Sequence, residues 1–108
     1  MDANEVIDGA IDYITENGWC QNNLTKPDGS ACMRGAMMMG AGAKLDKNSE
    51  INLSDEEFDW YRFSDAIRKV EKVIHEDTKA LITVPNYNDL IATSQEDVLL
   101  VLKRAKEA

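Results

Sequence analysis

Three glycines inside a helix-forming stretch limit what this chain can fold into. Residues 31–45, ACMRGAMMMGAGAKL, place Gly35, Gly40 and Gly42 among residues that favour helices. A glycine in the interior of a helix costs about 1 kcal/mol relative to alanine, so we expect close packing to compensate. The packed face of this helix would be lined by Cys32, Ala36, Met39 or Gly40, and Ala43. Neighbouring helices could approach that face closely, or a second copy of the chain could, with the methionines filling irregular gaps.

Three further helices follow from the spacing of apolar residues. Residues 4–17 repeat them every three or four positions and end at Gly18. A second, longer helix should begin at Ser54, where Glu57 completes a capping box, and run to about Asp77. A last helix follows Thr93 or Ser94, capped together with Glu96 or Asp97. The remaining caps are predicted at Asp2 or Asn4 for the first helix and at Ser30 for the glycine-containing one.

The longest helix should be the scaffold, because it carries a long apolar face. The residues expected to face inward are Phe58, Tyr61, Phe63, Ala66, Ile67, Val70, Val73 and Ile74. Trp60 falls outside that spacing and should lie at the edge of the face.

Two segments between helices carry no helical pattern. Residues 46–53 are polar and predict a loop, and Pro85 with the Asn and Asp residues after it predicts a short extended passage or half-turn. The fold class expected is therefore all-α: a compact bundle of about four helices with a short irregular or extended segment near residues 80–92. With 108 residues the chain should form a single domain, residues 1–108.

Charge narrows the classes of partner. The formal net charge is −8, and its excess lies in residues 1–17 and 54–77. Such a surface repels a phosphate backbone, so direct binding of nucleic acid is not expected. A basic protein partner or mimicry of a polyanion stays open, although an acidic surface most often only keeps a protein soluble. The N-terminus lacks the basic start of a signal peptide, and no apolar run is long enough for a membrane span. We therefore expect a cytoplasmic protein without membrane contact, whose Cys20 and Cys32 stay thiols.

The stretch GWCQNN, residues 18–23, is the first candidate site. Cys20 as a nucleophile would need a base, and the only imidazole is His75, near the end of the long helix. A metal site could recruit Cys20, Cys32, His75 and Asp28, but no close-spaced ligand pair of the C-x-x-C kind is present. We therefore expect no metal and no cofactor, and we interpret Cys20 as a small apolar residue beside Trp19 at the end of the first helix.

The second candidate is NYND, Asn86 to Asp89. Two amides and a carboxylate around Tyr87 could bind a ligand, or Asp89 could act as a base. The alternative is ordinary turn chemistry between Pro85 and the last helix.

These elements together resemble a family of small proteins from actinobacteria and their bacteriophages. Its pattern is a Trp-Cys-Gln element, a Cys-x-x-Gly-Ala element and a Trp-Asn-Asp element before a C-terminal helix. The matching positions here are Trp19, Cys20, Gln21, Cys32, Gly35, Ala36, Asn88 and Asp89. Tyr87 departs from the family, which usually has Trp there. The resemblance supplies no reaction, but it implies that Trp19, Gln21, Asp28, Asn88 and Asp89 meet in a polar network at one end of the bundle.

Three functions follow as hypotheses. The first is a phage-encoded, non-enzymatic protein of the host cytoplasm that binds a host or phage protein. The second is a small-ligand-binding protein, with Trp19, Cys20, Gln21, Asp28, Cys32, Tyr87, Asn88 and Asp89 as candidate ligand-binding residues. The third is an enzyme that depends on Cys20. A dimer through Gly35 and Gly40 stays open, and no catalytic set is convincing enough to be preferred.

Overall fold

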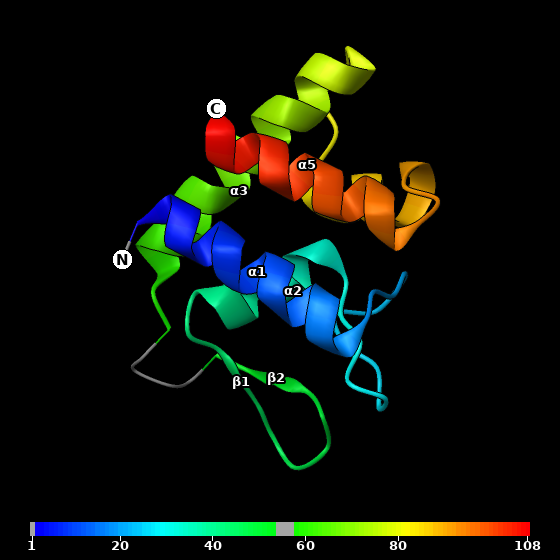
Figure 1. Ribbon diagram of the computed structural model, residues 1–108. Coiled ribbons are helices and arrows are strands. Elements are labelled where there is room, and N and C mark those ends of the chain that lie inside the picture. Colours follow the sequence, from blue (N-terminus) through cyan, green and yellow to red (C-terminus); the bar gives the residue numbers. More distant parts are fainter. Residues whose placement is uncertain (1, 54–57) are drawn as a thin grey trace.

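The computed structural model describes residues 2–53 and 58–108, and helices dominate these residues. The elements in chain order are α1 (Ala3–Asn17), α2 (Met33–Gly40), β1 (Lys44–Leu45), β2 (Ile51–Asn52), α3 (Trp60–Thr78), α4 (Val84–Asn86), the π-helical turn η1 (Tyr87–Ile91) and α5 (Gln95–Glu107). Figure 1 shows α1 and α5 side by side and antiparallel, with α2 below α1 and α3 passing behind both. The described residues thus hold five α-helices, whereas the sequence predicted about four.

Close backbone contacts explain two glycines of the central stretch, Gly40 at the crossing of α1 and α2 and Gly35 beside the loop before α2. A Cβ atom on Gly9 would lie 2.7 Å from Gly40 Cα, and one on Gly40 would lie 2.2 Å from Val6 O. On Gly35 it would lie 2.3 Å from Leu24 O. The predicted close approach is confirmed, and it takes place within the chain. Gly35 and Gly40 therefore face their own backbone and do not form a seam for a second copy.

Helix α2 is shorter than predicted and is capped by another residue. Ala31 forms bridges with Trp19 and Thr25, which hold the chain extended before the helix. Cys32 then serves as the N-cap, because its Sγ accepts from Gly35 N at 3.3 Å. The prediction of Ser30 as the cap was wrong, as was the continuation to residue 45.

The segment predicted as a loop contains a small hairpin. Strands β1 and β2 pair antiparallel, with Leu45 opposite Ile51, and the hairpin projects from the helices in Figure 1. Asp46 organises its turn, since Oδ1 accepts from the backbone N–H groups of Asn48 and Glu50. The loop prediction was therefore wrong at residues 51–52.

Helix α3 begins later than predicted. Asp59 caps it by accepting from Arg62 N at 3.0 Å, and the predicted capping pair Ser54 and Glu57 lies outside the described residues. Tyr61 is 87% exposed, so its predicted inward position was wrong. Phe63, two residues further along, is buried, and at about 100° per residue Tyr61 lies on roughly the opposite side of the helix.

Residues 84–91 correct the prediction of an extended passage. Pro85 lies in the first turn of α4, where its missing N–H removes no helical bond, and Thr83 caps that turn. The chain continues into η1, which ends where Ala92 N donates to Tyr87 O at 2.9 Å. The predictions for α1 and for the Ser94 cap of α5 are confirmed.

Candidate functional site

The side chain of Asn88 joins three segments that lie far apart in the sequence. It is completely buried. Its Oδ1 accepts from Trp19 Nε1 at 2.6 Å and from Met33 N at 2.9 Å. Its Nδ2 donates to Cys20 O at 3.1 Å and to Asp89 Oδ1 at 2.9 Å. An amide side chain has two acceptor positions and two donor hydrogens, so every one of them is used here.

Gln21 and Asp89 extend this arrangement around Asn88. Gln21 Nε2 donates to Asn88 O at 3.0 Å and to Ala92 O at 3.1 Å. Asp89 Oδ1 also accepts from Asn22 N at 2.9 Å. Four of the five residues expected in a polar network therefore meet, namely Trp19, Gln21, Asn88 and Asp89. They form a closed plug rather than an open pocket.

Three of the other candidate residues lie outside the plug. Asp28 Oδ1 accepts from Ser30 N at 2.9 Å and from Ser30 Oγ at 2.7 Å, and these bonds lower the pKa of Asp28. The expectation that Asp28 joins the network was wrong, because its carboxylate is used within its own turn. Tyr87 is buried in the core, which raises the pKa of its hydroxyl. Cys32 caps α2.

The surroundings of Cys20 disfavour a thiolate. Its exposed fraction is 5%, and burial is the main cause that raises the pKa of its thiol. The Ser30 hydroxyl and Lys26 act in the opposite direction, but the carboxylates of Asp28 and Asp89 raise the pKa further. The Cys20 Sγ instead donates to Asn23 O at 3.5 Å.

Of the groups named for thiol or metal chemistry, Asp28, Asp89 and Cys32 act electrostatically with Cys20, whereas His75 is not among the groups that affect its pKa. His75 lies exposed in the last turn of α3, at the helix end where it was predicted. Burial also raises the pKa of Cys32. Over residues 2–53 and 58–108, no three His, Cys, Asp or Glu side chains come together to hold a metal ion.

Two hollows flank the plug. Cys20 and Asp28 line one of them, Cys32 lines the other, and Tyr87 lines neither. One is a polar bay of about 510 Å³, lined by Asn17, Gly18, Trp19, Cys20, Gln21, Asn22, Lys26, Asp28, Ser30 and Gln95. The other is a smaller hollow of about 180 Å³, lined by Asn22, Asn23, Leu24, Cys32, Arg34, Pro85 and Asp89. Two donors at the edge of the bay are already used, because Trp19 Nε1 donates to Asn88 and Gln21 Nε2 donates to Asn88 O and Ala92 O.

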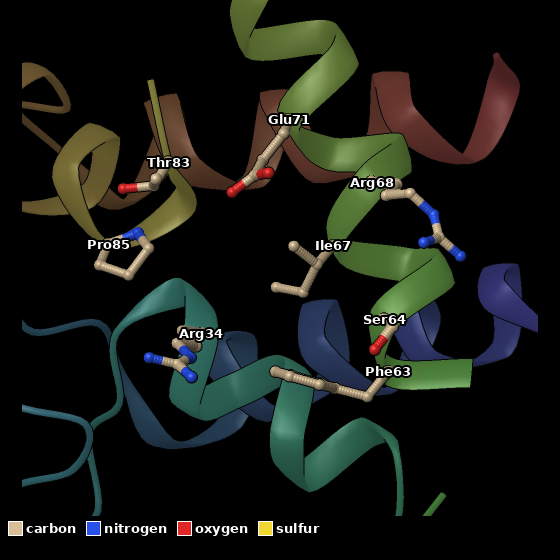
Figure 2. A pocket seen from close by; sticks show the side chains of 8 residues that line it. All are labelled: Arg34, Phe63, Ser64, Ile67, Arg68, Glu71, Thr83 and Pro85. Atoms are coloured by element: carbon tan, nitrogen blue, oxygen red, sulfur yellow. The ribbon is translucent and has the colours of Figure 1, made fainter. Parts of the chain in front are cut away.

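A third depression, which we term the α2–α3 groove, was not predicted from the sequence. It measures about 420 Å³ and is lined by Arg34, Phe63, Ser64, Ile67, Arg68, Glu71, Thr83 and Pro85. Figure 2 shows Ile67 and Glu71 extending from α3 toward Pro85 and Thr83, with Arg34 projecting from α2 below Pro85. Arg34 and Pro85 also line the smaller hollow, so the two depressions adjoin along these residues.

The charged groups of the α2–α3 groove differ in how they are satisfied. Arg68 pairs with Asp65 one turn earlier on α3, and Glu71 Oε2 accepts from Val84 N at 3.0 Å. The exposed Arg34 guanidinium makes no hydrogen bond or ion pair with any residue that the structure describes. In the sequence, the only signal for this role was a single cation in the otherwise uncharged stretch ACMRGAMMMG.

None of the helices in the described part of the chain combines the length and the apolar character that a membrane span requires. Comparison with curated proteins and with solved structures gives no match. A family model does match, and it covers residues 1–108. The chain therefore belongs to the family of unknown function DUF6197.

Proposed function

We propose that this protein is a non-enzymatic binding protein that holds a segment of a partner protein in the α2–α3 groove. The observation that carries the proposal is the groove itself: an apolar floor beside an exposed arginine that has no partner within the described residues. Binding sites combine these features, because apolar contacts supply affinity and a few polar groups supply orientation.

The hydrogen bonds of the Asn88 plug favour a protein-binding function over small-ligand binding, and the state of Cys20 favours it over an enzyme that depends on this thiol. The Asn88 side chain makes all four of its hydrogen bonds within the chain, so neither this amide nor the Trp19 indole N–H bonded to it is available to a small ligand. The buried, high-pKa Cys20 thiol is a poor nucleophile, because the thiolate is the reactive species.

The partner we propose is a host or phage protein in the cytoplasm, as the resemblance to proteins of actinobacteria and their phages suggests. The acids on the outer face of α1 would attract a partner of basic overall charge. Glu5, Asp8, Asp12 and Glu16 are all exposed there. Long-range attraction of this kind accelerates association and weakens as salt is added.

Site-specific photo-crosslinking tests the groove. A benzoylphenylalanine at position 64 replaces Ser64, an exposed residue of the groove, and the matched control places it at Lys103, an exposed residue of α5 that lines none of the described depressions. After irradiation in the cells that produce the protein, we expect a specific covalent adduct from position 64 and none from position 103. Equal adducts at both positions, or none at position 64, would refute the proposal.

A further inference from the structure

We infer that the partner segment carries a carboxylate that pairs with Arg34, next to an apolar side chain that packs on Ile67, Phe63 and Pro85. The inference rests on the proposed function, because it names the chemistry that the α2–α3 groove would select. It concerns an acidic and apolar segment of a protein chain.

The positive charge of Arg34 favours a partner segment that carries a carboxylate. The chain has 20 acidic and 12 basic residues, yet this guanidinium is without a carboxylate among the described residues. The second arginine of the groove, Arg68, is already paired with Asp65. A guanidinium binds a carboxylate through two parallel hydrogen bonds, which a lysine cannot reproduce. Within the part of the chain that the structure describes, Arg34 is therefore the cation of the groove to which a partner can contribute the anion.

The apolar floor of the groove favours an apolar side chain in the partner segment. Phe63 has 5% of its surface exposed, and Ile67 and Pro85 are half-buried. Figure 2 shows Ile67 between α3 and Pro85, where it forms an apolar surface beside Arg34. A volume of about 420 Å³ has room for one or two side chains, within the range of about 300–1,000 Å³ usual for binding pockets.

Glu71 sets the direction in which such a segment would lie. Its Oε2 already accepts from Val84 N, and its Oε1 makes no hydrogen bond with the described residues. A second carboxylate would be repelled at this end, whereas a peptide N–H could donate to Oε1. The acidic side chain of the partner therefore belongs at the Arg34 end and its main chain at the Glu71 end.

Two observations favour a peptide over a free anion. The groove adjoins the smaller hollow along Arg34 and Pro85, so an extended chain could pass from one to the other. The N–H groups at the start of α2 do not form an anion site, because Met33 N donates to Asn88 Oδ1 and Gly35 N to Cys32 Sγ. The guanidinium of Arg34 is the group that remains.

The test compares two peptide pools that differ in a single side chain. One is acetyl-Gly-X-Glu-X-Gly-amide, with Leu, Ile, Val or Phe at each X, and the other has Gln in place of Glu. Binding is followed by NMR titration of the full chain labelled with nitrogen-15, using the Arg34 Nε–H and the backbone signals of α3. We expect the Glu pool to bind about fivefold more tightly, with shifts at Arg34, Ile67 and Thr83.

Two variants identify the group responsible. R34Q should remove the preference for Glu over Gln, whereas R68Q, the matched control, should keep it because Arg68 is paired within α3. Both arginines are exposed, so neither change should disturb folding. A Glu preference that survives in R34Q would overturn the inference.

Other outcomes separate this inference from the proposed function. If both pools bind equally in the groove, the carboxylate inference fails while groove binding stands. If neither pool binds but position 64 still yields an adduct, the inference alone fails; if there is no adduct either, both fail. Binding of 3-phenylpropionate at Arg34 as tight as that of the Glu pool would overturn the choice of a peptide.

Discussion

Replacing Asn88 by alanine should cost a large part of the stability of this small domain. The change leaves Met33 N and Cys20 O, two buried backbone groups, without their partner. A buried polar group without a partner costs about 1–3 kcal/mol, and the deleted side chain leaves a small cavity as well. Trp19 Nε1 also loses its acceptor, although Trp19 borders the polar bay and water could replace Asn88 there.

We therefore expect Asn88→Ala to lower the free energy of unfolding by about 4 kcal/mol, out of a total of about 5–15 kcal/mol usual for a single domain. Urea unfolding followed by far-ultraviolet circular dichroism measures this difference. Asn86→Ala is the matched control, because Asn86 is exposed and its side chain makes no hydrogen bond with the described residues. A loss below about 1.5 kcal/mol, or one no larger than that of the control, would refute the structural role of the plug.

Three further predictions follow from other parts of the molecule. Gly40→Ala should destabilise by about 3 kcal/mol in the same assay, because its Cβ would lie 2.2 Å from Val6 O, and a loss under 1 kcal/mol would mean that α1 and α2 pack less closely than described. Cys20 and Cys32 should react with a disulfide reagent at neutral pH at least about tenfold more slowly than a free thiol, because burial raises the pKa of both. Rapid labelling of Cys20 would instead support the hypothesis that it is a nucleophile. Hydrogen bonds from Thr93 lower the pKa of Asp97 in the folded state, so Asp97 should stabilise the start of α5 at neutral pH and lose this effect as the pH falls below its ordinary pKa of 3.8. In Asp97→Asn, that part of the acid-induced loss of stability should be absent when unfolding is followed by circular dichroism between pH 5 and pH 2.

Local patterns in the sequence were sufficient for α1, the body of α3 and α5, because periodic apolar residues and capping side chains act within one or two turns. They failed where a distant contact decides the local structure. Cys32 replaces Ser30 as the cap because bridges from Ala31 to Trp19 and Thr25 hold the preceding residues extended. Tyr61 was assigned inward from its spacing to Phe58, although it lies two residues from the buried Phe63 and therefore on roughly the opposite side of α3.

The candidate site, like the fold, could be predicted from the sequence only in part. Resemblance to a family brought Trp19, Gln21, Asn88 and Asp89 together correctly, but no pattern indicated that Asn88 would use all its hydrogen-bonding capacity internally. The α2–α3 groove arises from three elements separated by up to 51 positions, Arg34 to Pro85, so no local signal could reveal it.

The π-helical turn at Tyr87–Ile91 makes the length of this segment critical. A π-turn accommodates one more residue than an α-turn, and each residue of an α-helix turns the chain by about 100°. A single deletion between Val84 and Ile91 would restore regular α-helical geometry but rotate Asn88 away from Trp19 and Met33. Substitutions at the exposed positions of this turn should therefore be tolerated in evolution far better than any insertion or deletion, which would disconnect the three motifs from one another.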